Sequence, residues 1–271
     1  MSIERPVPLD QIDFSVDPKV IDRAYSLLGK APDAPKPGSP SRWLKNPARG
    51  MFERLAMGLV GSTVTFPIPL VAMGGVKIFD GNPTLYNYQV GFLDIDNQPV
   101  NLQTITKVRS LKQQPWQSNI PNNSLPTALT GGKMYVEKED RVHSWWGTFI
   151  RKSSIDETPQ LWSILKGTMV GVGARGYTID ELDWLARIFQ LYDRGVQTFP
   201  QEVPDSYRKV VSEIQPRLGL FSLSSATKRK RSTISERLIT DWTFWMYANP
   251  LGDLKIILAT VGVVLKGIGA K

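Results

Sequence analysis

The chain has 271 residues, 41% of them hydrophobic and 21% charged, which is enough for a folded protein with a sizeable core. It has no cysteine, so disulfides, thiolate catalysis and thiolate metal sites are excluded. The formal net charge of +8 is uneven: residues 36–54 carry +4 and residues 217–271 carry +6, which is typical of proteins that bind nucleic acid or anionic lipid headgroups.

An acidic segment, a short helix and a proline-rich strap are predicted at the start of the chain. Residues 1–17 hold four acidic side chains and no apolar run, so we expect no secretion signal. Asp17 followed by Pro18 predicts the start of a helix that ends before Gly29. Four prolines within residues 30–40 disfavour both helix and strand pairing, so this segment is predicted to be extended.

An amphipathic helix and then a sheet are predicted next. Apolar side chains recur at three- and four-residue intervals over residues 51–60, which is a helical pattern. Six later segments are rich in β-branched and aromatic residues: 63–73, 76–79, 84–95, 100–111, 133–136 and 142–150. We predict that the first four form an antiparallel meander and that the last two form a further strand pair.

Helices are predicted to dominate the second half, over residues 158–165, 178–192, 205–214 and 233–247. One of them begins at Thr178, with Glu181 three residues later as a capping box. The predicted fold class is therefore α+β, with an antiparallel sheet in the first half followed by a mostly helical second half. We divide the chain into the helix and strap (1–41), an α+β core domain (42–216) and a basic and aromatic C-terminal segment packed on the core (217–271).

Three patterns could carry chemistry, and each has a plainer interpretation. Gly171–Gly176 matches the G-x-G-x-x-G pattern that binds dinucleotide phosphates, but the helix begins only at Thr178, which favours an interhelix turn. His143 is the single histidine, so we interpret it as a half-buried strand residue rather than a metal ligand. Asp94 and Asp96 could share a divalent cation or form a turn. We predict no catalytic residue, no metal and no cofactor.

The predicted binding residues are basic and aromatic. The candidate contacts to anionic lipid or nucleic acid are Arg42, Lys45, Arg49, Arg54, Lys228, Arg229, Lys230 and Arg231. The last four also resemble a short nuclear-import signal. Trp242 and Trp245 precede an apolar run at 254–265, which at 12 residues is too short to cross a membrane. These tryptophans could contact a membrane or partner, or belong to a terminal helix and strand docked into the core.

This organisation resembles the matrix proteins of enveloped negative-strand RNA viruses. The run Phe-Pro-Ile-Pro at 66–69 is similar to a budding motif of some such proteins, and Tyr-Ser-Leu-Leu at 25–28 has the Tyr-x-x-Leu form of another. The resemblance implies a non-enzymatic structural protein of the virion and host cytoplasm. Such a protein would self-assemble into homo-oligomers at the inner face of a membrane, bind acidic lipid and nucleocapsid, and enter the nucleus through an import receptor. The alternatives are an RNA-binding nucleocapsid-type protein and a nucleotide-binding enzyme.

Overall fold

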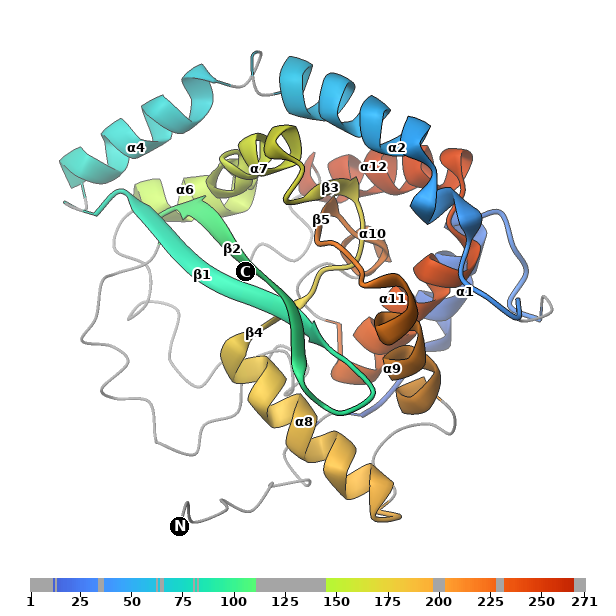
Figure 1. The fold of residues 1–271 in the computed structure, drawn as a ribbon. Helices are drawn as coiled ribbons and strands as arrows, with labels where there is room; N and C mark the ends of the chain where they lie inside the picture. The colour runs from blue at the N-terminus through green and yellow to red at the C-terminus, as the bar shows by residue number, and fades with distance from the viewer. Residues whose placement is uncertain are drawn as a thin grey trace, which may run out of the picture.

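The structure is a computed structural model that describes residues 12, 14–33, 37–61, 63, 66–79, 81, 83–110, 145–196, 203–227 and 232–265. Its elements up to the long hairpin are α1 (Pro18–Leu27), η2 (Arg42–Lys45), α2 (Pro47–Phe52), η3 (Glu53–Val60), α4 (Pro67–Phe79), β1 (Leu85–Leu93) and β2 (Pro99–Val108). The remaining elements are α6 (Trp145–Ser153), η5 (Ile155–Glu157), α7 (Gln160–Lys166), β3 (Val170–Val172), β4 (Tyr177–Thr178), α8 (Ile179–Asp193), α9 (Val203–Ile214), β5 (Gly219–Phe221), α10 (Leu223–Thr227), α11 (Ile234–Tyr247) and α12 (Pro250–Leu265). The predicted α+β class is confirmed (Figure 1).

Two helices begin where the local sequence predicted. The side chain of Asp17 accepts a hydrogen bond from the Lys19 amide, and Pro18 fills the first turn of α1. Helix α8 begins with a complete capping box, in which Thr178 and Glu181 each accept the other's backbone amide. The helices predicted at 158–165, 205–214 and 233–247 are also present, as α7, α9 and α11.

The hairpin of β1 and β2 crosses the middle of the molecule (Figure 1). The two strands are antiparallel, so that Tyr86 lies opposite Lys107 and Tyr88 opposite Ile105. Strand β4 pairs with the other edge of β1, and β3 and β5 form a separate parallel pair. The predicted strands at 84–95 and 100–111 are therefore confirmed, but the four-stranded meander is not formed.

Three strand predictions were wrong. Residues 67–79 form helix α4, although 63–73 and 76–79 were predicted as strands. Of the strand predicted at 142–150, the described part lies in helix α6, while 133–136 lies outside the described residues. The reason is tertiary: α4 and α6 bury a common face against β2 around Ala72, Val76 and Ile150, and this packing outweighs the strand propensity of single residues.

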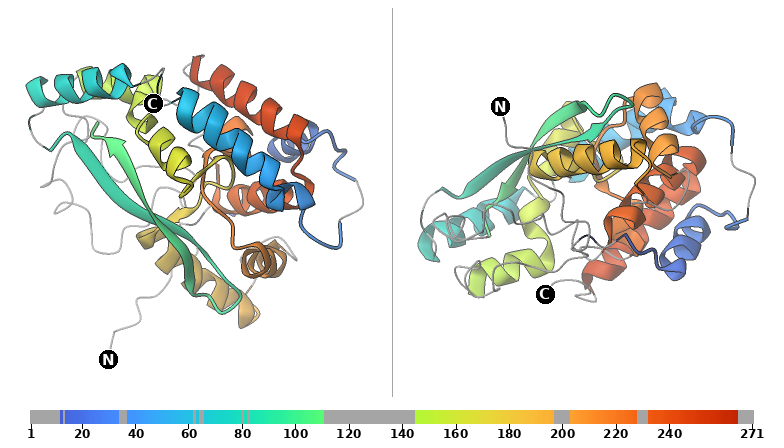
Figure 2. Two further views of the ribbon diagram at one scale, coloured as in Figure 1. Left: turned by 45° about the horizontal axis from the view of Figure 1, so that its top comes forward. Right: turned by 90° about the horizontal axis from the view of Figure 1, so that it is seen from below.

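The main core surrounds α11. Trp245 is 1% exposed and packs edge-on against Phe92 of β1, with ring centroids 5.9 Å apart. It also contacts Tyr207 of α9, whose tilted ring has its centroid 5.2 Å away. Figure 2 shows α8 lying along the hairpin, and α8 also contacts α11, because Nη1 of Arg237 lies 3.1 Å from Oε1 of Glu181. The start of the chain also joins this core, because the Ser41 amide donates to the carbonyl oxygen of Trp245 at 2.9 Å. The division into three segments at 41 and 216 stays a prediction.

Candidate active site

A charged cluster forms where the open end of the hairpin meets η5. Lys107 of β2 places its Nζ atom 2.7 Å from Oε1 of Glu157. The same Nζ lies 5.6 Å from the ring centroid of Tyr88 on the neighbouring strand. The Lys107 and Glu157 side chains are 19% and 28% exposed, so the pair is partly shielded from water and still reachable by a ligand.

The short turn η5 presents two adjacent carboxylates at this place. It begins after Ser154, whose φ of 56° is left-handed, a backbone state that costs a non-glycine residue about 1–3 kcal/mol. The hydroxyl of Thr158 closes the turn by donating to the Ile155 carbonyl at 2.7 Å. Asp156 is 8% exposed, and Glu157 follows it directly. Residues held in such sparsely populated backbone states cluster at functional sites.

The electrostatics of the cluster favour a permanent cation. Burial by itself would lower the pKa of the Lys107 ammonium, but the negative charges of Glu157 and Asp156 raise it above its ordinary value. Burial also raises the pKa of the Tyr88 hydroxyl, and the cations Lys107 and Arg175 oppose that rise. Lys107 therefore stays protonated at neutral pH. The segment that carries Arg175 reaches the same strand as Tyr88, because Tyr177 pairs with Gly91 of β1.

Arg175 comes from the glycine segment at residues 171–176. This segment runs beside β5, and a Cβ atom on Gly173 would lie 2.9 Å from the Gly219 nitrogen, so only glycine allows the close approach. Nη1 of Arg175 donates to the hydroxyl of Ser225 at 3.2 Å. The segment is buried and includes strand β3, so the predicted flexible interhelix turn was wrong.

The cluster has the composition of a phosphate-binding site. Lys107 and Arg175 supply positive charge, and Asp156 and Glu157 supply carboxylates beside it. Lysine and arginine are the usual side-chain partners of phosphate groups, and carboxylates hold protons or hard cations. Within the described part of the chain, no three His, Cys, Asp or Glu residues are grouped to hold a metal ion by themselves.

Sequence reasoning missed Lys107, Asp156 and Glu157, and it considered Arg175 only as part of the glycine pattern at 171–176. Asp156 and Glu157 precede Thr158–Pro159, which was used only as a helix start signal. Lys107 is one polar residue in a strand, with no local pattern around it. The usable signal was the charged pair of carboxylates in a short link between two helices, but charged links are common on protein surfaces.

Of the basic contacts predicted from the sequence, Arg42, Lys45 and Arg54 are exposed. The cluster at 228–231 lies outside the described residues. No contact with an anion is tested for these residues, so that role stays a prediction.

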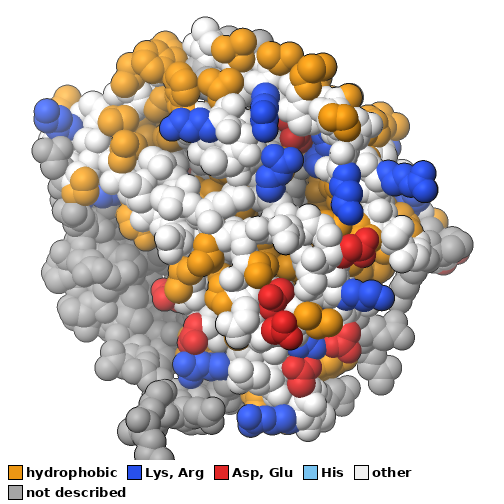
Figure 3. Space-filling view, viewed as in Figure 1, with side chains coloured by type: hydrophobic (Ala, Val, Ile, Leu, Met, Phe, Trp, Pro, Cys, Tyr) orange, Lys and Arg blue, Asp and Glu red, His pale blue; other side chains and the backbone are white. Residues whose placement is uncertain are grey.

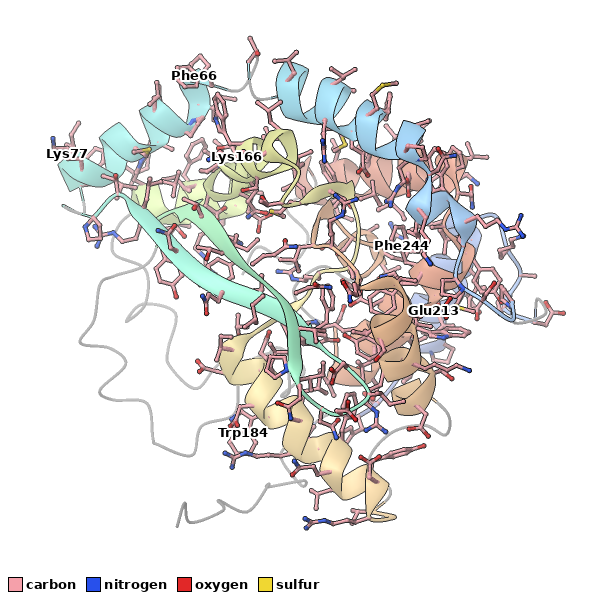
Figure 4. All side chains as sticks on the ribbon, viewed as in Figure 1. Phe66, Lys77, Lys166, Trp184, Glu213 and Phe244 are labelled. Carbon is pink, nitrogen blue, oxygen red and sulfur yellow. The ribbon has the colours of Figure 1, made fainter. Side chains whose placement is uncertain are left out.

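The fourth residue of the first basic group, Arg49, is 5% exposed and has an internal role. Its Nε atom lies 3.0 Å from Oδ2 of Asp253, and its Nη2 atom donates to the carbonyl of Val172. Glu53 lies 3.4 Å from the same guanidinium and accepts from the Val172 amide. Arg49 therefore joins α2 to β3 and α12, which corrects the prediction that it is a surface contact. Its guanidinium also lies 5.8 Å from the ring of Phe244 (Figure 4).

The other predicted sites are structural where they are described. Trp245 belongs to the core and Trp242 is partly buried against it, so Trp245 is not a membrane contact. Oδ1 of Asp94 accepts the amides of Asp96 and Gln98 at 3.0 and 2.8 Å, which is the turn interpretation of this pair. His143 lies outside the described residues.

The surface next to the site is unusually apolar. Figure 3 shows apolar side chains along the upper edge of the molecule, over α2, η3 and α4. Those at least half exposed are Met51, Phe52, Leu55, Leu59, Leu70, Val71 and Ile78. A contiguous surface of this kind marks an interaction site. Among the described residues, no helix is both long and apolar enough to span a membrane.

Comparison with known proteins identifies similarity over most of the chain. A family model described as "Bacterial sugar transferase" matches residues 45–267. The chain is 32% identical over 146 residues to galactosyl transferase CpsE of Streptococcus agalactiae serotype III, covering 53% of this chain and 27% of that protein. It is 27% identical over 198 residues to the undecaprenyl-phosphate galactose phosphotransferase of Salmonella typhimurium, covering 70% and 35% of the two chains.

A third relative is the UDP-galactose-lipid carrier transferase of Erwinia amylovora, 29% identical over 130 residues, which are 46% of this chain and 22% of that protein. The matches thus cover about a third or less of each of these relatives.

These matches overturn the functional predictions made from the sequence. The chain is similar to bacterial sugar transferases, so the interpretation as a non-enzymatic viral matrix or nucleocapsid protein was wrong. The predicted locations in the virion, host cytoplasm and nucleus, and the predicted nucleocapsid and import-receptor partners, are wrong for the same reason. Net charge and short tetrapeptides are shared by unrelated proteins, and they carried too little information to decide the class.

Proposed function

The chain belongs to the bacterial sugar transferase family, and on that premise we propose that it transfers a sugar phosphate from a nucleotide-activated sugar to a lipid-linked phosphate. The names of two relatives support this reaction class, one an undecaprenyl-phosphate galactose phosphotransferase and the other a UDP-galactose-lipid carrier transferase. The donor would be a sugar nucleoside diphosphate, and the acceptor a polyprenyl phosphate.

The observation that carries this proposal is the cluster of Lys107, Asp156 and Glu157. Phosphoryl transfer depends mainly on positioning and on stabilising the charge of the transferred group. The Lys107 ammonium, held at 2.7 Å by Glu157, supplies a fixed positive charge for the diphosphate of the donor. Arg175 would add a second cation, since the segment that carries it pairs with β1, the strand of Tyr88, through Tyr177 and Gly91.

The proposed reaction moves one phosphorus atom between two oxygen atoms. An oxygen of the lipid phosphate forms a bond to the β-phosphorus of the donor. The bond from that phosphorus to the oxygen bridging the α-phosphate breaks. The products are a lipid diphosphate sugar and a nucleoside monophosphate, so atoms and charge are conserved.

The two carboxylates also fit a magnesium ion carried by the substrate. Magnesium is commonly bound through one or two carboxylates together with substrate phosphates, and Asp156 and Glu157 are adjacent in η5. When bound, such an ion would neutralise part of the diphosphate charge. The chain's own contribution is to hold the carboxylates in a fixed turn opposite Lys107.

A lipid acceptor is also consistent with the apolar surface of α2, η3 and α4. We assign this surface to contact with the membrane that carries the acceptor. Val71 and Ile78 of α4 are 64% and 78% exposed. Phe66, just before α4, packs edge-on against Trp162 of α7, with ring centroids 6.3 Å apart. Because α4 also packs on η5, the apolar surface lies beside the charged cluster.

A product assay tests this function. The purified full chain is incubated with UDP-galactose, Mg²⁺ and undecaprenyl phosphate in detergent micelles, and the released nucleotide is measured. Release of UMP that depends on the lipid phosphate is the expected result. Lipid-dependent release of UDP would indicate transfer of the sugar alone, and no release with a panel of nucleotide sugars would contradict the proposal.

A further inference from the structure

We infer that Arg237 of α11 is a positioning residue that fixes the glycine segment and thereby places Arg175 in the active site. This inference rests on the proposed function, because it assigns to Arg175 a role in binding the phosphates of the donor. Arg237 itself lies inside the protein, at 7% exposure, and is not a catalytic residue.

Arg237 contacts the glycine segment directly. Its Nη2 atom donates to the carbonyl of Gly176 at 2.7 Å, and its guanidinium carbon lies 4.2 Å above the ring of Tyr177. Its Nη1 atom lies 3.1 Å from Oε1 of Glu181, the capping residue in the first turn of α8. One guanidinium therefore holds the end of the segment against both α8 and the ring that follows it.

The backbone at this point depends on such support. Gly176 has a φ of +67°, and a Cβ atom there would lie 3.3 Å from the carbonyl oxygen of Gly91 as well as against Leu218. The next residue, Tyr177, pairs with Gly91 of β1. The segment is thus confined between β1 and β5, and the orientation of its peptide groups decides where the Arg175 side chain points.

A second buried residue of α11 lies close to the glycine segment. Asp241 lies one helical turn after Arg237 and is 1% exposed. The backbone amide of Arg175 is close enough to lower the pKa of this carboxyl, without forming a hydrogen bond of standard geometry. Arg237 therefore holds the residue that follows Arg175 through the Gly176 carbonyl, and Asp241 lies one turn further along the same buried face of α11.

Arg208 provides a matched control. It is also a buried arginine, at 5% exposure, and lies 2.7 Å from Asp193, 2.6 Å from Asp205 and 5.0 Å from the ring of Phe189. It contacts Asn97 in the β1–β2 turn, at the opposite end of the hairpin from Lys107. Its loss should reduce stability without moving Arg175.

The test measures the steady-state constants of R237M, R237K, D241N and R208M beside the unchanged chain, with the melting temperature of each. We expect R237M to raise the KM for the nucleotide sugar by about tenfold or more, because a displaced Arg175 no longer holds the phosphates of the donor in the right orientation. The KM for the lipid acceptor should stay unchanged. R237K should recover part of the loss, and D241N should raise the donor KM less than R237M.

The outcomes separate this inference from the proposed function. Absence of transfer by the unchanged chain contradicts the proposed function itself. An active unchanged chain whose donor KM is unaffected in R237K and D241N overturns the positioning role, whether or not R237M folds. An equal rise of donor KM in R208M would also overturn it, because the effect would then follow lost stability.

Discussion

Lys107 and Glu157 lie 2.7 Å apart in space and 50 residues apart in sequence. One belongs to the second strand of the hairpin and the other to a three-residue turn between two helices. Their contact brings the buried carboxyl of Asp156 and the ring of Tyr88 to the same place. The charged cluster that we propose as the active site therefore exists only because the hairpin packs against η5.

Removing either member of this pair should abolish most of the transfer activity. We expect K107M and E157Q each to lower kcat/KM by at least about 10²-fold, since K107M removes the cation aimed at the transferred phosphoryl group and E157Q removes the carboxylate charge that holds this cation. Release of UMP measures the loss. K77M is the control, because Lys77 is exposed on α4 (Figure 4) and its replacement should leave kcat/KM unchanged. Activity of K107M within twofold of the unchanged chain would exclude Lys107 from the site.

Replacing Arg49 should cost stability rather than activity at the site. R49M leaves Glu53 and Asp253 buried without their cation, and a broken buried pair typically costs about 3–5 kcal/mol. The free energy of unfolding in urea measures this change. R42M is the comparison, since Arg42 is exposed and its loss should change that free energy by no more than about 0.5 kcal/mol. Equal effects of the two substitutions would contradict the buried network.

The stability of the protein should depend on pH through Asp241. Burial raises the pKa of this carboxyl to about 7 from its ordinary value of 3.8, although the cations Arg237 and Arg175 oppose the rise. Tyr177 and Tyr207 are its other titratable neighbours. The folded state thus binds a proton that the unfolded state releases. This contribution to the free energy of unfolding is full below the unfolded pKa and is lost as pH rises through about 7.

The substitution D241N isolates this effect. Glu53 and Asp253 also have raised pKa values, so the unchanged chain loses stability with pH for several reasons. Between about pH 5 and about pH 8, the free energy of unfolding of D241N should therefore rise relative to that of the unchanged chain. Urea unfolding at the two pH values measures it. A difference that stays constant would show that Asp241 does not titrate in this range.

Charges on the apolar surface should weaken membrane association. We expect V71E and I78E to reduce the fraction of the full chain that floats with lipid vesicles, because each places a carboxylate on a surface proposed to contact apolar lipid. I95E is the control, since Ile95 is 56% exposed in the β1–β2 turn, away from α4. If all three variants float equally, another surface binds the membrane.

Local sequence predicted the elements whose signals are chemical and short-range. Asp17 with Pro18 marked α1, and Thr178 with Glu181 marked α8, because capping satisfies amides of the first turn whatever surrounds the helix. The turn signals between 95 and 100 marked the hairpin for the same reason. The prediction failed for α4 and α6, where neighbouring side chains decide the structure.

The sequence by itself determined the fold class, the helix starts, the hairpin and the absence of thiol chemistry, since these follow from composition and from contacts within a few residues. Only the tertiary structure decided which charged residues act together. Arg49 became internal because Asp253 and Glu53 meet it, and Lys107 became a site residue because Glu157 is packed against it. Such pairs depend on distance in space and on shielding from water, and no local pattern in the chain records either quantity.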